Sequence, residues 1–359
     1  MQIAVLGGGN GSYAAAADLS EQGHQVRLWR RDAAGLAPLL AKKSLTLKDA
    51  KGTREVPLAL VTTDIGDALR GAELIVIPTP AFSQDSIARQ MAPHLTDGQV
   101  IFLPPGTFGS FAMMQQVRAS GSKAEIIFAE TGTLPYLTRK HGPTEVAITV
   151  RAVRLPTGFF PAKQSERGFA VVSKAFPAIH LIEDALSGAL MNGGPIIHPP
   201  LILMNAGPLE FQERYDIHNE GTQPSVRRVT DALDDERIAV REALGYRPYH
   251  YPLRDTYSSD RWMYGDTHKV LVDSGDWREK INLTEHRYMT EDIHYGLSFL
   301  VSVANWVGVP APTATGLLAI ASAVCSRDLT NGPRTMTSLG LAGRSPGEVA
   351  SMLTAGAVA

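Results

Sequence analysis

The sequence predicts an α/β fold, a Rossmann-like and doubly wound sheet of mostly parallel strands, followed by an all-α second domain. In the first half of the chain, short apolar runs alternate with helical patterns, which is typical of an open sheet covered on both faces. A glycine-rich turn directly follows the first of these runs. From about residue 186 onward, strand signals stop and long segments of helical period take over. We therefore expect an α/β domain over residues 1–185 and a helical domain over residues 186–359.

The expected strands of the first domain are apolar along their whole length, as strands buried on both faces of a parallel sheet are. They lie at 2–7, 25–29, 58–63, 73–78, 99–104 and 125–130. A seventh run at 147–153 is a candidate to extend the same sheet. Helical patterns between the strands include Ser12–Gln22 and Ser83–His94.

Three long amphipathic segments define the expected helical domain: Val226–Leu244, Glu291–Val307 and Ala311–Ala323. The stretch Tyr246–Lys280 is polar, aromatic and weakly periodic, so we expect a loop-rich excursion there. Apolar helices of this kind would suit a homodimer.

Composition excludes several classes of protein. A formal net charge of -2 gives no electrostatic fit to nucleic acid or to an anionic membrane. No apolar run reaches the roughly 18 residues of a membrane helix, and no signal-peptide pattern precedes the first strand, so we expect a cytoplasmic protein. Because the chain has a single cysteine, Cys325, it can form neither an internal disulfide framework nor a cysteine-based metal cluster. The setting of Cys325 predicts a small buried hydrophobe. We expect no metal site.

The glycine-rich turn reads GGGNGS over residues 7–12 and lies between a strand and an alanine-rich helix. In this context the pattern predicts a turn that binds the pyrophosphate of a nicotinamide dinucleotide at a helix N-terminus. The expected cofactor-binding residues are Gly7, Gly9, Asn10, Gly11 and Ser12, where serine replaces the third glycine of the usual pattern. The other interpretation is a glycine-rich turn that binds no ligand.

The end of the second strand bears on cofactor choice. An acidic residue there binds the ribose hydroxyls of NAD, whereas arginine binds the 2′-phosphate of NADP. This chain has Arg30 and Arg31 at that point, followed by Asp32. The pattern favours NADP and leaves NAD open, because both arginines could be solvated while Asp32 binds the ribose.

Three loops that follow predicted strands should line the groove beyond the carboxyl ends of the sheet. From these loops we expect Pro78, Thr79, Pro104 and Glu130 to contact the cofactor, and Thr133 to contact the substrate. Each loop could equally be a rigid turn.

A histidine suits the proton transfer that accompanies hydride transfer near neutral pH, and His198 has an unusual setting among the ten histidines. Asn192, a candidate substrate-binding residue, precedes it, and Pro199 and Pro200 follow it. The proline pair is expected to start a helix, which would place His198 at its N-terminal end, facing the interdomain cleft. The alternative is a hydrogen-bonded structural histidine.

A second cluster lies before the segment IHYGLSFLVSVANWV. Thr290 could cap that helix, with Glu291 and Asp292 in its first turn, and capping alone would explain these residues. One acid placed near His198 would instead fix the tautomer of the imidazole and raise its pKa. Arg287 could bind a substrate carboxylate with two hydrogen bonds.

At these motifs the sequence resembles the opine dehydrogenase family, which comprises the octopine/nopaline dehydrogenase group and bacterial relatives that act on N-(carboxyalkyl) amino acids. The resemblance spans nearly the whole chain. It rests on the segments VLGGGNGSYAAAADLSEQGHQVRLW, NGGPIIHPPLILMNAG, EGTQPSV followed by LDDERIAVREALG, HRYMTEDIHYGL and RTMTSLGL.

The resemblance implies a Rossmann-like domain followed by a helical substrate domain. It also implies the NAD(P)H-dependent reductive condensation of an α-keto acid with the amino group of an amino acid. By this match His198 is the general acid and base, Asp292 is its carboxylate partner, and Arg287 is the candidate for substrate carboxylate recognition. Ser12 replaces the third glycine that is usual in the family. Arg30 replaces the acid that NAD-preferring relatives carry, and this second departure leaves cofactor preference open.

Two other functions fit parts of the sequence. Ketopantoate and glycerol-3-phosphate reductases share the two-domain plan but use a lysine where the second domain begins, and residues 186–209 contain no lysine. A non-catalytic redox sensor that binds NADP would need only the glycine turn, and would leave the His198 and Asp292 elements without a role.

Overall fold

The computed structural model describes residues 1–258, 260–265 and 280–358. Cα packing divides the chain into two units. Unit 1 consists of Met1–Ala189 together with Leu353–Val358. Unit 2 runs from Leu190 to Met352. The return of the C-terminal segment to unit 1 was not expected from the sequence.

Unit 1 is built on an eight-stranded sheet with the order β12-β11-β8-β7-β6-β1-β2-β5. Its strands include all six expected ones, which run parallel to one another, while β11 and β12 run antiparallel to these six. The strand order reverses beside β1, which makes the carboxyl end of β1 the point where ligands bind in such sheets. The bounds are β1 (Gln2–Leu6), β2 (Gln25–Trp29), β5 (Leu60–Thr62), β6 (Leu74–Val76), β7 (Val100–Leu103), β8 (Ile127–Thr131), β11 (Leu155–Phe160) and β12 (Ile179–Leu181).

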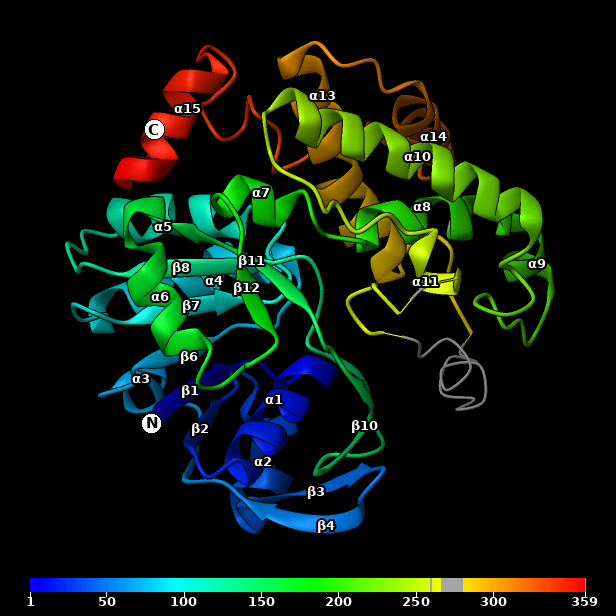
Figure 1. The fold of residues 1–359 in the computed structure, drawn as a ribbon. Helices are drawn as coiled ribbons and strands as arrows, with labels where there is room; N and C mark the ends of the chain where they lie inside the picture. The colour runs from blue at the N-terminus through cyan, green and yellow to red at the C-terminus, as the bar shows by residue number, and fades with distance from the viewer. Residues whose placement is uncertain (259, 266–279, 359) are drawn as a thin grey trace. The chain divides into compact units, whose positions relative to one another are not determined.

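Helices join these strands and cover the sheet (Figure 1). The strands β1, β6, β7 and β8 are buried on both faces, which is why they read as continuous apolar runs. The helices are α1 (Asn10–Glu21), α2 (Ala33–Lys42), α3 (Ile65–Leu69), α4 (Ala81–Met91), α5 (Gly109–Ala119), α6 (Ser165–Val172) and α7 (Ala185–Ala189), with short 3₁₀ turns η1 (Ala92–His94) and η2 (Ala162–Gln164).

Unit 1 also contains a second, four-stranded sheet with the order β4-β3-β10-β9. Its strands are β3 (Ser44–Asp49), β4 (Gly52–Pro57), β9 (Tyr136–Lys140) and β10 (Glu145–Arg151). The expectation that residues 147–153 extend the main sheet is therefore wrong. Buried and partly exposed residues alternate along β10, because one face of this sheet packs on α1 and the other does not. As a result α1 contacts strands of both sheets (Figure 1).

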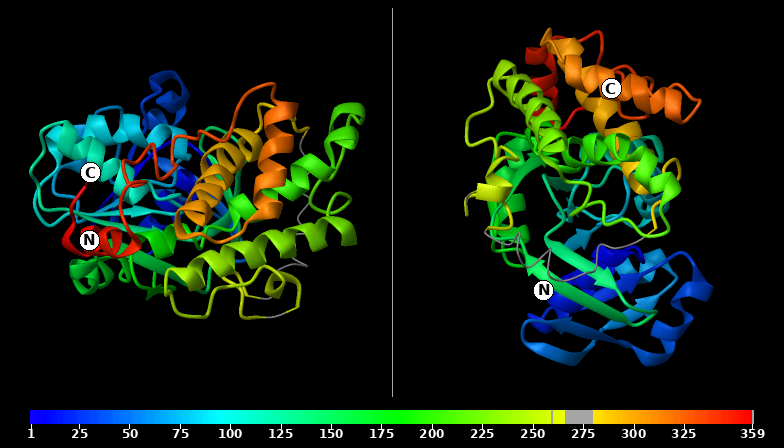
Figure 2. Two further views of the ribbon diagram at one scale, coloured as in Figure 1. Left: turned by 90° about the horizontal axis from the view of Figure 1, so that it is seen from above. Right: turned by 90° about the vertical axis from the view of Figure 1, so that its right-hand side faces the viewer.

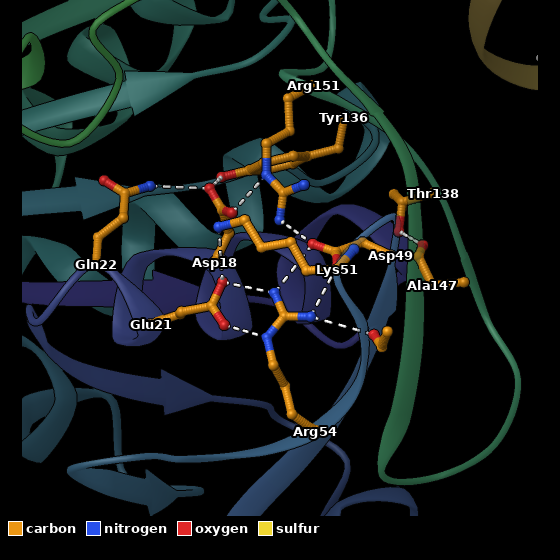
Figure 3. Close-up of polar contacts among 11 residues, drawn as sticks. Asp18, Glu21, Gln22, Asp49, Lys51, Arg54, Tyr136, Thr138, Ala147 and Arg151 are labelled. Carbon is orange, nitrogen blue, oxygen red and sulfur yellow. Dashed lines mark hydrogen bonds and ion pairs between the residues drawn. The ribbon is translucent and has the colours of Figure 1, made fainter.

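An ion network fastens the C-terminal half of α1 to this second sheet (Figure 3). Arg151 donates to Asp18 at 2.7 Å and to Asp49 at 2.8 Å, and Arg54 joins Asp49 at 2.7 Å to Glu21. The Arg54 guanidinium, opposed by burial and assisted by Arg151, holds the pKa of Asp49 well below its ordinary value. The helix that begins at the glycine turn is thereby held at its other end.

Helices alone make up the regular structure of unit 2 in its described residues. α10 lies beside α13 and α14, as both views show (Figures 1 and 2). Of the segment Tyr246–Lys280, expected as a loop, residues 259 and 266–279 lie outside the described residues. The elements are α8 (Gly194–Met204), α9 (Ala206–Phe211), α10 (Pro224–Ala243), α11 (Asp255–Ser258), the π-helix η3 (Tyr288–Leu297), α13 (Ser298–Val307), α14 (Pro312–Val324) and α15 (Pro346–Ala355), whose last turn belongs to unit 1.

Among residues 1–258, 260–265 and 280–358, no helix has both the length and the apolar character to cross a bilayer. No group of three or more metal-ligating side chains occurs among them either. Cys325 is half-buried at the end of α14 rather than fully buried as expected, and burial raises the pKa of its thiol.

Candidate catalytic and cofactor sites

The glycine turn after β1 has a backbone that requires glycine at its first position. Gly7 has a φ of +133°, and its N–H donates to the carbonyl of Trp29 at 2.9 Å. A Cβ atom at Gly7 would lie within 3.0 Å of the Ser12 hydroxyl and of the Thr79 methyl group. The conformation and the close packing together explain this glycine.

The second glycine of the turn faces open space. Gly9 is the N-cap of α1 with no side-chain cap, is exposed, and a Cβ atom there would meet no atom within 4 Å. Beside the turn, the buried hydroxyl oxygens of Ser12 and Thr79 have no hydrogen-bond partner within the described part of the chain. The start of α1 thus offers unpaired backbone N–H donors, two hydroxyls without partners and open space at Gly9. These features fit the pyrophosphate of a dinucleotide.

Two of the expected loops reach the start of α1. A Cβ atom at Gly11 would lie within 3.0 Å of a Leu134 methyl group and 3.1 Å from the Cβ of Pro78. The loops after β6 and β8 therefore pack on the first turn of α1. Thr133, the expected substrate-binding residue, is half-buried in the second of these loops.

Glu130 has a role other than the expected cofactor contact. Its side chain is fully buried and accepts hydrogen bonds from the N–H of Phe108 and from the N–H and hydroxyl of Ser110, the last two at 3.1 and 2.6 Å. The orphan donors at the start of α5 attract a carboxylate, so Glu130 caps that helix. Pro104, in the loop before α5, is also buried.

The two arginines after β2, Arg30 and Arg31, make different contacts. Arg30 pairs with Asp32 at 2.6 Å and donates to the carbonyl of Gly35 at 3.0 Å. The other oxygen of Asp32 caps α2 by accepting from the N–H of Gly35 at 3.1 Å. Arg31 is exposed and reaches Ser86 at 3.4 Å. The only acid at this strand end is therefore already bound, and the strand end stays cationic.

Lys140 is a basic residue at the glycine turn that the sequence did not reveal. It ends β9, its backbone N–H donates to the Asn10 side chain at 2.9 Å, and its ammonium group donates to the carbonyl of Gly8 at 3.1 Å. The same ammonium lies 3.6 Å from the ring centroid of Tyr13. No sequence signal could have identified it, because the second sheet that positions it was not predicted.

In unit 2, His198 of α8 and Asp292 of η3 form a hydrogen-bonded pair. The imidazole Nδ1 lies 2.8 Å from Asp292 Oδ2, and the two side chains are 16% and 4% exposed. Burial lowers the pKa of His198 below its usual 6.5 and outweighs the opposing effect of Asp292. Burial would raise the pKa of Asp292, but His198 and Arg287 hold it below its ordinary value. The pair therefore consists of a neutral imidazole and an ionised carboxylate near neutral pH.

Two glycines let the helices of this pair approach closely. A Cβ atom at Gly194 would lie within 3.0 Å of Asp292 Oδ1, and one at Gly296 would collide with the ring of Pro195. Asn192, expected to bind substrate, accepts from the N–H of Gly194 at 3.0 Å and so supports the start of α8. The contact between α8 and η3 thus places the Asp292 carboxylate at the imidazole.

Both expected helix starts in this region are wrong. α8 begins at Gly194 with a proline in its first turn, so Pro199 and Pro200 lie inside it and His198 lies one turn further in than expected. η3 begins at Tyr288, so Thr290 lies inside it and does not cap it. Tight packing of the two helices stabilises helix starts that local propensity does not predict.

Arg287 precedes η3 and points toward both acids. Its guanidinium lies 3.5 Å from Glu291 Oε2 and 3.8 Å from Asp292 Oδ2. The side chain is 54% exposed, whereas those of Glu291 and Asp292 are buried. Arg287 therefore presents a cationic group to solvent beside the dyad.

Three further side chains surround His198 and were not predicted. The Tyr288 ring stacks on the imidazole with centroids 3.7 Å apart and planes 10° apart. The Tyr288 hydroxyl and His218 Nε2 share a hydrogen bond of 2.8 Å. His286 meets the Tyr288 ring edge-on at 4.3 Å. Only Tyr288 and His286 lay in a motif singled out from the sequence.

Family comparisons match the two halves of the chain separately. Residues 181–325 match the family described as NAD/NADP octopine/nopaline dehydrogenase, alpha-helical domain. Residues 2–118 match the family described as NAD-dependent glycerol-3-phosphate dehydrogenase N-terminus. The expected dinucleotide-binding domain is thereby confirmed.

Full-length relatives agree with the helical-domain match. An opine dehydrogenase from Arthrobacter sp. (strain 1C) is 28% identical over 352 residues, which covers 95% of each chain. The structure of octopine dehydrogenase with NADH and L-arginine has a TM-score of 0.73 at 19% identity and covers 98% of each chain. Yersinopine dehydrogenase with bound NADP⁺ has a TM-score of 0.67 at 18% identity, over 99% of this chain and 98% of that one. The expected fold class and the family resemblance are confirmed.

Proposed function

We propose that this chain, a homologue of the opine dehydrogenases and an NAD(P)-dependent oxidoreductase, joins an α-keto acid to the amino group of an amino acid by reductive condensation, with His198 and Asp292 as its acid–base dyad. The observation that carries the proposal is the 2.8 Å contact between the two side chains, in the unit that matches the opine dehydrogenase helical domain. NADP is the preferred cofactor in this proposal.

The geometry of the dyad supports an acid–base role for His198. Because Nδ1 faces the Asp292 carboxylate, the neutral imidazole carries its proton on Nδ1 and leaves Nε2 as the base. The carboxylate fixes the ring orientation and stabilises the imidazolium that forms during turnover. Such a positioned base contributes roughly 10²- to 10⁴-fold to a rate.

The proposed proton transfers balance through His198. Nε2 takes a proton from the ammonium group of the amino acid, so that the free amine attacks the keto carbon. The imidazolium then returns the proton to the hydroxyl group that leaves as water, and the product of this step is a protonated imine. A reduced nicotinamide, when bound, supplies the hydride that converts the imine carbon to that of a secondary amine. In the reverse direction Nε2 takes the extra proton of the secondary ammonium group, because only the neutral amine can release hydride.

Arg287 is proposed to bind a substrate carboxylate. Both substrates of the reaction carry carboxylates, and a guanidinium binds a carboxylate through two parallel hydrogen bonds. Its half exposure and its distance of 3.8 Å from Asp292 favour this role, because a bound carboxylate would lie beside the dyad. Asn192 and Thr133 remain candidates for contacts with the remainder of the substrate.

A substrate panel tests the proposal. NADPH and NADH oxidation are measured with a series of α-keto acids, each with and without a series of amino acids. The proposal predicts oxidation that requires both substrates and is faster with NADPH. Oxidation with a keto acid alone would instead indicate a simple reductase. Binding of NADPH without oxidation under any combination would indicate a redox sensor, and either result would contradict the proposal.

A further inference from the structure

Two cationic side chains meet at one glycine of the cofactor turn. Lys140 donates to the carbonyl of Gly8 at 3.1 Å from the end of β9. At the same glycine, a Cβ atom would lie 2.8 Å from Nε of Arg30, which follows β2. Two segments that are about 110 residues apart in the chain therefore bring their cations to the same point of the glycine turn.

Lys140 has no acidic partner in the described residues. Its contacts there are the Gly8 carbonyl and the face of Tyr13, while Asp32 pairs with Arg30. Burial, together with the charge of Arg30, lowers the pKa of Lys140 to about 8. An unpaired, half-buried ammonium beside a guanidinium is unfavourable unless an anion joins them.

We propose that Lys140 and Arg30 together bind the 2′-phosphate of NADP, and that Lys140 selects NADP over NAD; the inference deepens the cofactor preference in the proposed function. The end of the second strand is where the adenosine ribose of a dinucleotide lies in this fold, and Arg30 stands there. The pyrophosphate is instead expected in the open space at Gly9, at the start of α1. A phosphate dianion between the two cations removes their mutual repulsion.

Asp32 is the group that would oppose this assignment. A free acid at this position would accept the ribose hydroxyls of NAD and repel a 2′-phosphate. Here one oxygen caps α2 and the other pairs with Arg30, so the carboxylate is engaged on both sides. With Arg31 also present, the strand end and Lys140 together carry three cations against one anion.

Direct cofactor binding tests the proposal without any turnover. Dissociation constants for NADPH and NADH are measured by calorimetry for the full chain and for Lys140→Met, Lys140→Arg and the control Lys123→Met. Lys123 is exposed in the loop between α5 and β8, and β8 is separated from β1 by β7 and β6 in the main sheet. Thermal melts of the variants establish that each is folded.

The expected result is a loss specific to NADPH. Lys140→Met should weaken NADPH binding about 10- to 100-fold, because a hydrogen bond between charged groups is lost, and change NADH binding less than about threefold. Lys140→Arg should stay within about fivefold of the parent, and Lys123→Met should match it. Equal weakening of both cofactors, or no weakening of either, would overturn the proposal. An absence of opine formation would contradict the proposed function and leave this result intact.

A pH series separates phosphate binding from a structural role. The charged and titratable groups that act on Lys140 are Arg30 after β2, which is itself paired with Asp32, and Tyr13 of α1. Because the 2′-phosphate dianion binds the protonated lysine, NADPH affinity should be constant near pH 7 and fall as the pH rises through about 8. Lys140→Arg should abolish this fall, because arginine keeps its charge. A fall that persists in Lys140→Arg would contradict the proposal.

Discussion

The imidazole of His198 and the phenol ring of Tyr288 lie face to face, with ring centroids 3.7 Å apart and planes inclined by 10°. Tyr288 is itself held by the 2.8 Å hydrogen bond between its hydroxyl and His218. The imidazole is therefore fixed in two ways: Asp292 binds its edge, and Tyr288 covers its face. Orientation of the base depends on both.

Truncation of Tyr288 should slow turnover by releasing the imidazole. Tyr288→Leu removes the stacked ring and should lower kcat by roughly tenfold, the order of an aromatic pair's contribution. Tyr288→Phe keeps the ring and loses only the hydrogen bond to His218, so its kcat should fall less than about fivefold. Steady-state kinetics at saturating cofactor measure both. Equal effects of the two variants would mean that stacking does not position the base.

The pH dependence of opine oxidation should report the titration of His198. In this direction the imidazole must be neutral to accept a proton, and burial lowers its pKa below 6.5, so kcat/KM should rise with pH and level off by neutral pH. Asp292→Asn removes the charge that raises this pKa, so the midpoint should move to lower pH. The plateau should fall about 10²- to 10⁴-fold through loss of the correct tautomer. A midpoint unchanged by Asp292→Asn would contradict the assignment.

Gly194 should be needed for activity although it contacts no substrate in the proposal. A methyl group at this position would collide with Asp292 Oδ1, so Gly194→Ala should displace the carboxylate and lower kcat at least about tenfold. Gly207→Ala in α9 is the matched control, because a Cβ atom there would meet no atom within 4 Å. Cofactor affinity should be the same in both variants. Parent-like kcat in Gly194→Ala would show that the placement of Asp292 is not critical.

The ion network under α1 should contribute to stability in a pH-dependent way. Asp49 is almost fully buried between Arg54 and Arg151, so Asp49→Asn should lower the free energy of unfolding by roughly 3 kcal/mol. Because the pKa of Asp49 is depressed in the folded chain, this stability is present at neutral pH and is lost as the pH falls below about 5.

Denaturant titrations at several pH values measure the effect of Asp49. The control is Asp67→Asn, which removes an exposed i,i+3 pair with Arg70 and should cost less than about 1 kcal/mol. The difference between the parent and Asp49→Asn should shrink as the pH is lowered. If the difference in free energy of unfolding stayed constant from neutral pH to below about pH 5, the charge of Asp49 would not be what stabilises the fold.

The main sheet of unit 1 could be predicted because its strands are buried on both faces and the turn after β1 is chemically constrained. Gly7 needs a positive φ, and Gly9 leaves space for a ligand to approach the backbone. Both requirements select glycine, and the resulting spacing of glycines can be recognised in the sequence. The second sheet could not be predicted in the same way. Its strands pack on α1 with one face only, so they do not form continuous apolar runs, and β3 pairs with β10 across about 100 residues of sequence.

The dyad could be proposed only through the resemblance to a family, because spacing does not bring residues 198 and 292 together. Local propensity also predicted the wrong helix starts around them. The prolines at 199 and 200 predict a helix start, yet the helix begins at Gly194. Because Gly194 has no side chain, the Asp292 carboxylate can lie against it. Tertiary packing therefore decides the geometry of the site, and Tyr288 enters it by the same packing.

The proposed reaction depends most directly on His198 as the catalytic base. The decisive measurement is the turnover number of His198→Ala with an α-keto acid and an amino acid as substrates, together with its dissociation constant for NADPH. NADPH affinity should stay within about twofold of the parent, because the proposed cofactor residues are in unit 1, and turnover should fall at least about 10²-fold. Full turnover in His198→Ala would contradict the assignment of His198 as the base.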